Sequence, residues 1–315
     1  MNENLLGKCD LLCTGKDILM NGVCIDRNMN NIAAGLVFSL YGQLPDVNKF
    51  KECKEILRSK TRFFNNFRTG FEYVLICKMV LKENPEEYLN QVLAVYERLR
   101  YYSVGQNANM GYAATIVCDL NKQDQAAEIV GTHRMIMEGL KSRQALLTSY
   151  EDIPYTILLA LSHRDTEVIV QDVLDCYAYL KERLKTDSNS IQGVSLTLAL
   201  SEESVEVKCE KLLRFLKLYS DRQRQYKRDQ GMNILGLLMK MKEEDEAFFV
   251  DEVIEVSDHL FKFKGFGNLD LGIPKRLCLA TCLCAANKEI DDENLFQWDL
   301  QVIREISILL AVSFY

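Results

Sequence analysis

The tetrapeptide Leu159-Ala160-Leu161-Ser162 recurs as Leu198-Ala199-Leu200-Ser201, and the two copies start 39 positions apart. Pro154 and Pro274 each open an apolar run, and they lie 120 positions apart, three times forty. A recurrence of about forty residues is typical of helical hairpins that stack side by side. The sequence therefore predicts an all-α protein built as an α-solenoid.

Equivalent positions can be placed near the start of the first helix of each hairpin, with separations of 39, 39, 43, 39, 40 and 41 residues. These positions are Ala34, Tyr73, Tyr112, Tyr155, Val194, Ile234 and Lys275. The second helix carries an apolar stripe, which one hairpin cannot bury alone, so neighbouring hairpins must stack. We expect about seven stacked hairpins with a period near forty residues. They form one domain, 1–315, in which 1–30 is an N-terminal cap or arm and 31–315 holds the repeats.

Composition restricts the possible partners and compartment. The net charge of −7 makes the chain as a whole repel nucleic acid and anionic membranes. The 11 cysteines are an odd number, and most fall at apolar positions of expected helices, where a free thiol acts as a small hydrophobe. The first ten residues, MNENLLGKCD, contain neither a basic leader nor a long apolar run. We therefore expect a cytoplasmic protein.

Catalytic and metal motifs do not emerge from the sequence. The three histidines, His133, His163 and His259, are far apart, and His133 falls on an apolar stripe, which favours a hydrogen-bonded core histidine. No HExxH, phosphate-binding glycine loop or GxSxG elbow is present. Cys278 and Cys282 are four apart on an apolar helix, which favours packing over zinc binding. We expect no catalytic residues, no cofactor and no metal.

Charge follows the repeat, with acidic residues where the second helix begins and basic residues where it ends. In a stack of parallel units this predicts an acidic rim along one edge and a basic rim along the other. The helix dipole alone favours such a pattern. The alternative is that the basic rim binds an acidic partner, and its densest stretch is 211–228. The candidate binding residues there are Arg214, Arg222, Arg224, Lys227 and Arg228.

Tyrosines also recur at matching repeat positions, at Tyr73, Tyr112 and Tyr155. One interpretation is that they fill the junctions between hairpins and direct the hydroxyl to a polar group. The alternative is an aromatic ladder on the inner surface that grips a peptide. Both interpretations stay open at this point, and the three tyrosines are further candidate binding residues.

Several segments resemble one family of bacterial cytoplasmic proteins, found in spore-forming and related Gram-positive bacteria and catalogued as domain of unknown function number four thousand and three. The similar segments are Lys16-Asp17-Ile18-Leu19, Asp152-Ile153-Pro154-Tyr155, Leu158-Leu159-Ala160, and Gln192-Gly193-Val194-Ser195-Leu196 with the second tetrapeptide. The likeness spans roughly residues 15 to 240. The resemblance implies no activity, cofactor or site.

Three functions are compatible with these patterns. The leading hypothesis is a non-catalytic scaffold that presents an extended inner surface to a protein or peptide partner. The alternative is an enzyme or small-molecule binder of the helical-toroid kind, with a concave pocket. The third is backbone-directed nucleic-acid binding through residues 211–228, which the overall acidity disfavours. The sequence leaves the oligomeric state open.

Overall fold

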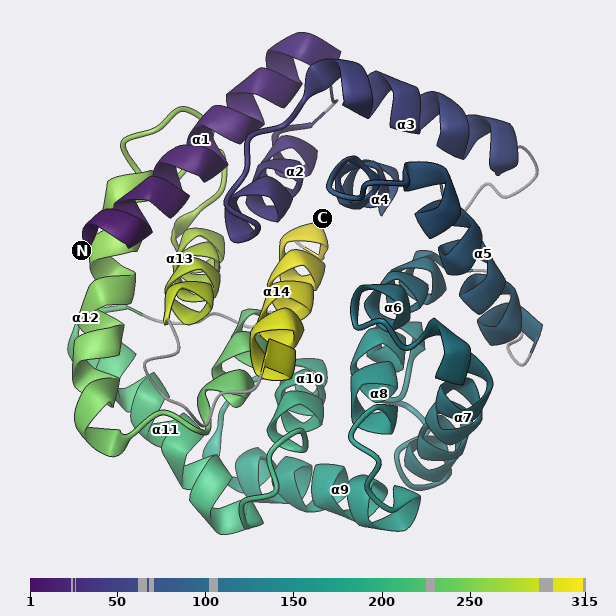
Figure 1. Ribbon diagram of the computed structural model, residues 1–315. Coiled ribbons are helices and arrows are strands. Elements are labelled where there is room, and N and C mark those ends of the chain that lie inside the picture. Colours follow the sequence, from purple (N-terminus) through teal and green to yellow (C-terminus); the bar gives the residue numbers. More distant parts are fainter. Residues whose placement is uncertain are drawn as a thin grey trace.

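The computed structural model describes residues 1–23, 25, 27–61, 67, 71–101, 107–224, 230–288 and 297–313, with the backbone alone for 230 and 297–299. Within these residues every regular element is a helix, as predicted, and there is no strand. The helices form an outer and an inner layer around one central helix (Figure 1).

Helices of the outer layer are amphipathic. In α5, for example, Leu89, Val92, Tyr96 and Leu99 are buried at helical spacing, and the opposite face meets solvent. The layer consists of α1 (Glu3–Val23), α3 (Val47–Lys60), α5 (Pro85–Tyr101), α7 (Ala126–Arg143), α9 (Thr166–Arg183), α11 (Val205–Asp221) and α12 (Glu243–Leu260).

Helices of the inner layer are apolar nearly all round, and a helix of that kind must be covered on every side. In α4, every residue except Tyr73 is buried. The layer consists of α2 (Asn28–Leu40), α4 (Phe71–Val80), α6 (Ala108–Asp119), α8 (Ile153–Ala160), α10 (Ser188–Leu198), the 3₁₀ helix η4 (Gln230–Leu238) and α13 (Ile273–Asn287). Two short 3₁₀ turns, η2 (Gln123–Gln125) and η3 (Tyr150–Asp152), precede α7 and α8.

The described helices pair as seven outer–inner hairpins, consistent with the predicted number. All seven equivalent positions, Ala34 to Lys275, fall in inner elements, so the first helix of each predicted unit is an inner helix. Val302 and Ile303 fit the apolar stripe of an outer helix, but they lie in α14 (Gln297–Val312), which belongs to none of the seven hairpins. This helix occupies the centre of the ring and packs against α2, α6, α13 and η4 (Figure 1).

Residues 1–30 contain the outer helix of the first hairpin. Most of this segment is α1, the outer partner of α2, and the two helices touch at Gly35. A Cβ atom at Gly35 would lie 2.7 Å from the Leu12 carbonyl oxygen and 2.9 Å from the Lys16 amide nitrogen. Only glycine allows the two backbones to approach so closely, which fixes α1 in the first hairpin.

The array closes on itself, so its two ends meet instead of lying apart as in an open solenoid. Lys8 of α1 donates through Nζ to the Ala286 carbonyl oxygen at the end of α13, at 2.7 Å. Asn28 of α2 donates through Nδ2 to the Gly265 carbonyl oxygen, also at 2.7 Å. The N-terminal amine pairs with Glu255 of α12. These contacts join the first hairpin to the seventh.

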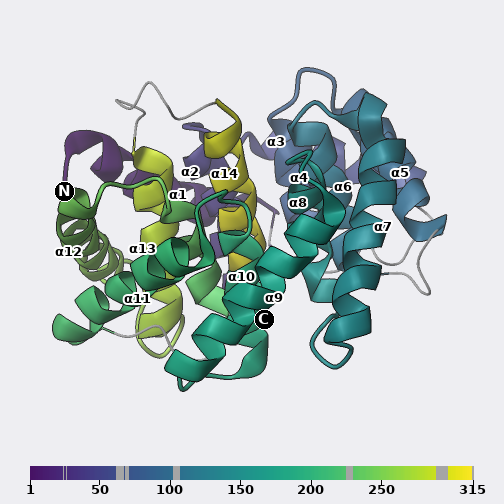
Figure 2. The same cartoon turned by 90° about the horizontal axis from the view of Figure 1, so that it is seen from below.

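Most outer helices follow the circumference of the ring, whereas α13 and α14 stand along its axis (Figures 1 and 2). The basic end of one outer helix therefore meets the next outer helix, and the prediction of separate acidic and basic rims is wrong. The ion pairs are Lys60–Glu86 at 2.7 Å, Arg143–Glu167 at 3.0 Å, Arg183–Glu210 at 3.9 Å, Arg214–Glu243 at 3.5 Å and Arg222–Asp251.

Candidate functional site

The repeated tetrapeptide lies at one end of the ring, where inner helices α8 and α10 finish. Leu161-Ser162 and Leu200-Ser201 follow these helices, and Met239-Lys240 follows η4 in the equivalent place. We call the surface made by the loops after α6, α8, α10 and η4 the mouth. Each of the last three loops brings one apolar residue to it, followed by at least one polar residue.

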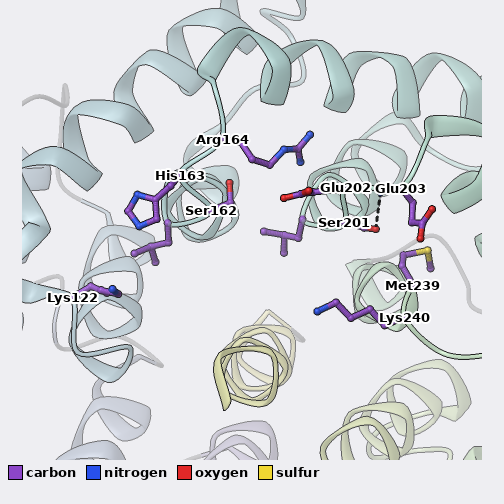
Figure 3. A pocket seen from close by; sticks show the side chains of 11 residues that line it. Lys122, Ser162, His163, Arg164, Ser201, Glu202, Glu203, Met239 and Lys240 are labelled. Carbon is purple, nitrogen blue, oxygen red and sulfur yellow. Dashed lines mark hydrogen bonds between the residues drawn. The ribbon is translucent and has the colours of Figure 1, made fainter. Parts of the chain in front are cut away.

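A pocket of about 930 Å³ opens at the mouth (Figure 3). Its apolar lining is Leu161, Leu200 and Met239. The other lining residues are polar: Lys122, Ser162, His163, Arg164, Ser201, Glu202, Glu203 and Lys240. Leu161 and Met239 are buried, whereas His163, Glu202, Glu203 and Lys240 are exposed, so the pocket has an apolar interior and a charged rim of both signs.

Cations from the outer part of the ring hold the loops of the mouth in place. The last carbonyl oxygens of a helix lack partners within it, and a cation near them satisfies them and also favours the helix dipole. Lys208 Nζ donates to the Ser201 carbonyl oxygen at 3.2 Å, and Lys211 Nζ donates to that of Met239 at 2.7 Å. Outside the mouth, Lys49 Nζ donates in the same way to the Lys82 carbonyl oxygen, beyond α4, at 2.9 Å.

At the back of the pocket, Asp172 of α9 links Lys208 to a second cation, Arg164. Lys208 Nζ lies 2.6 and 2.8 Å from the two carboxylate oxygens, and Arg164 Nη2 lies 3.0 Å from Oδ2. Arg164 also donates through Nη1 to the Ala199 carbonyl oxygen at 2.5 Å. Because Lys208 is fully buried, this network is a rigid back wall that fixes the loops after α8 and α10. We call Arg164, Asp172 and Lys208 the back wall.

A second buried charge cluster ties the central helix to the ring. Lys78 Nζ of α4 lies 2.8 Å from Asp119 Oδ2 of α6, 2.5 Å from Glu305 Oε2 of α14 and 3.1 Å from Thr115 Oγ1. Lys82, a third exposed, pairs with the other oxygen of Asp119 at 2.7 Å. The side chains of Lys78, Asp119 and Glu305 are at most 1% exposed. We call these three residues the central cluster.

The cluster shifts the pKa of each of its members. Burial would lower the pKa of Lys78, but the charges of Asp119 and Glu305 outweigh it and hold that pKa well above its usual value. Burial would raise the pKa of Asp119, but Lys78 and Lys82 bring it below its usual value. For Glu305 burial prevails and raises the pKa to about 7, although Lys78 opposes it.

The raised pKa of Glu305 predicts a pH dependence of stability. Its ordinary pKa is 4.5, so between pH 4.5 and about 7 the folded state binds more protons than the unfolded state. Stability from this group therefore falls as pH rises through that window, by up to about 1.4 kcal/mol per pH unit. The side chain of Glu305→Gln does not titrate. Between pH 4.5 and about 7, the free energy of unfolding of wild type should therefore fall relative to that of Glu305→Gln. Urea titrations at several pH values measure this, with the exposed Glu138→Gln as control. Parallel curves for wild type and Glu305→Gln would contradict it.

The predicted basic residues do not gather at the mouth. Arg214 Nη2 lies 3.0 Å from Glu246 Oε1, Arg222 pairs with Asp251, and Arg224 Nη2 lies 3.0 Å from Asp258 Oδ1. All three acidic partners belong to α12, so these arginines join α11 and the loop after it to the next outer helix. Lys227 and Arg228 lie outside the described residues.

The predicted tyrosines occupy three separate surroundings. Tyr112 is buried, donates to the Glu305 carbonyl oxygen at 2.8 Å and has Lys78 Nζ over its ring. Tyr155 is also buried and accepts from Asn233 Nδ2 at 2.9 Å. Tyr73 is half-buried on α4, near Lys54 Nζ. Tyr112 and Tyr155 therefore pack in the core with a satisfied hydroxyl, and the three rings form no continuous ladder.

The described part of the chain shows neither a metal-binding cluster nor a membrane-spanning helix. No group of three or more His, Cys, Asp or Glu side chains is placed there to hold a metal ion. In the same residues, no helix combines the length and apolar character needed to cross a membrane.

Comparison with known proteins identifies a family for this chain. A family model described as "Protein of unknown function (DUF4003)" matches residues 21–313, nearly the whole chain, and confirms the resemblance noted in the sequence. No curated protein and no solved structure matches the chain. The chain therefore belongs to the DUF4003 family, whose description assigns no activity.

Proposed function

We propose that the protein is a non-catalytic binding protein whose mouth pocket holds an extended peptide segment of a protein partner. One observation carries this proposal: the lining of the pocket repeats. Leu161-Ser162, Leu200-Ser201 and Met239-Lys240 bring an apolar residue and a polar residue from three successive inner elements. A repeating surface suits a ligand that repeats, and a polypeptide is such a ligand.

Distances between the repeats support an extended peptide. Packed helices lie about 8–10 Å apart, and an extended chain advances about 3.3 Å per residue. Every third residue of the peptide then meets an equivalent place in the next repeat. Three repeats accommodate peptide positions i, i+3 and i+6, so a segment of about seven residues spans the pocket.

The charges at the rim indicate which peptides fit. Lys122 and Lys240 come from the loops after α6 and η4, and Glu202 and Glu203 come from the loop after α10 (Figure 3). A segment that carries both an acidic and a basic side chain matches this arrangement better than one with a single sign. The apolar lining adds contacts for one or two aliphatic side chains.

The binding role is proposed for the cytoplasm. The ten cysteines that the structure describes are all buried thiols, as expected for small core residues in a reducing compartment. Nucleic-acid binding through residues 211–228 is disfavoured, because Arg214, Arg222 and Arg224 already pair with carboxylates.

A selection from a random heptapeptide library displayed on phage tests the proposal. We expect wild type to select peptides with a shared mixed-charge pattern, and the double variant Lys122→Glu, Lys240→Glu to bind their synthetic forms at least tenfold more weakly, about 1.4 kcal/mol. Lys262→Glu, Lys264→Glu is the matched control, because both lysines are exposed beyond α12, outside the pocket. No shared pattern, or equal losses in both double variants, would contradict it.

A further inference from the structure

A second cavity, of about 320 Å³, lies away from the mouth, between the outer helices α5 and α7 and the segment that leads into α8. Leu99, Val130, Met137 and Ile153 supply its apolar lining. Among the described residues that line it, His133 is the one titratable side chain that is buried, at 6% exposed. Arg134, Glu138 and Lys141 are exposed at its edge.

One nitrogen of the His133 ring has a fixed role. His133 Nδ1 lies 2.8 Å from Thr156 Oγ1, and that hydroxyl oxygen lies 3.0 Å from the carbonyl oxygens of both Asp152 and Ile153. The hydroxyl has a single proton, which it donates to one of these carbonyls, as threonine commonly does within a helix. It then accepts from His133, so the ring proton resides on Nδ1.

The other nitrogen is left as an acceptor. In a neutral imidazole one nitrogen donates and the other accepts, so Nε2 of His133 carries a lone pair. Burial lowers the pKa of His133 to about 4, and the ring therefore stays neutral near pH 7. Asp152, a buried acid whose carbonyl oxygen lies beside Thr156 Oγ1, has its pKa raised by burial to about 7, and its side-chain Oδ2 accepts from the Ser149 amide.

We propose that this cavity binds a small neutral molecule that has an apolar body and one O–H or N–H donor, which bonds to His133 Nε2. The volume sets the size, since a cavity of about 150 Å³ holds benzene, and this one is roughly twice as large. A bicyclic aromatic compound fits that space. Specificity for the donor follows because a ligand without it leaves a nearly buried acceptor unpaired.

Indole is the probe, because it is bicyclic and carries one N–H, and 1-methylindole is its matched partner without the donor. Titrations of the full chain are followed by long-range proton–nitrogen NMR of the histidine rings. We expect saturable binding of indole, a shift of the His133 Nε2 signal with those of His163 and His259 unchanged, and at least tenfold weaker binding of 1-methylindole.

Two variants keep the test decisive. His133→Phe should remove the preference for indole, and Met137→Trp should fill the cavity and abolish binding of both compounds without a change at His133. Circular dichroism establishes that each variant is folded. The proposal is overturned if wild type binds the two compounds equally, if neither binds at millimolar concentration, or if the spectra place the ring proton on Nε2.

Discussion

Above pH 7, where Glu305 is ionised, replacing Lys78 by methionine is expected to lower the free energy of unfolding by about 3–5 kcal/mol, because it leaves the buried carboxylate of Glu305 without its cation. Lys78 makes three hydrogen bonds in a site that excludes water, and each acceptor belongs to α6 or α14. The same change removes the pairing of Asp119 Oδ2. The loss should appear as a lower urea midpoint with an unchanged slope.

Lys82→Met is the matched control for this experiment. Lys82 pairs with the same Asp119, at 2.7 Å, but it is a third exposed. An ion pair of that kind contributes about 0–1 kcal/mol. If the central cluster holds α14 in place, the double variant Lys78→Met, Glu305→Leu should regain part of the loss, since no unpaired charge remains on α14. Equal effects of Lys78→Met and Lys82→Met would contradict the assignment.

The all-helical fold and its hairpins could be predicted from the sequence because they rest on local patterns. Apolar stripes, prolines at helix starts and the recurring tetrapeptide all reflect neighbours within one hairpin. Closure of the ring could not be predicted in this way. It depends on contacts such as Lys8 with Ala286 and Asn28 with Gly265, between residues more than 230 positions apart.

The position of α14 was missed for a similar reason. Val302 and Ile303 fit the stripe of an outer helix, and a stripe does not indicate which surface covers it. A signal was nevertheless present. Glu305 lies in a run of mostly apolar residues, and Lys78 lies in the otherwise apolar segment VLICKMV, where an isolated charge requires a buried partner. The two charges of opposite sign could have been matched to each other.

The mouth pocket was only partly foreseeable. The tetrapeptide that revealed the repeat also lines the pocket, through Leu161-Ser162 and Leu200-Ser201. The pairing of the basic residues in 211–228 could not be predicted, because a sequence does not show the direction of an outer helix. Arg214, Arg222 and Arg224 pair with carboxylates of α12. Helices along the axis would have separated the charges, whereas helices along the circumference bring them together as ion pairs (Figure 1).

Removing the carboxylate of Asp172 should both destabilise the protein and impair the mouth pocket. Asp172→Ala leaves Lys208, which is fully buried, and Arg164 without their anion. We expect the free energy of unfolding to fall by about 3–5 kcal/mol, as for other broken buried pairs. Arg164 also holds the Ala199 carbonyl oxygen, and Lys208 holds that of Ser201, so the loops after α8 and α10 lose a shared anchor.

The comparison with Asp175→Ala separates this effect from a general weakening of α9. Asp175 lies on the same helix, but it is exposed and bonds to Gln171 one turn away, so its removal should change stability by less than about 0.5 kcal/mol. Asp172→Asn keeps one oxygen acceptor but removes the charge, and its stability should fall between the two. Peptides selected on wild type should bind folded Asp172→Ala more weakly, because a loosened loop must be ordered on binding. Unchanged affinity in that variant would show that the back wall supports the fold alone, whereas unchanged stability would show that Lys208 finds another partner.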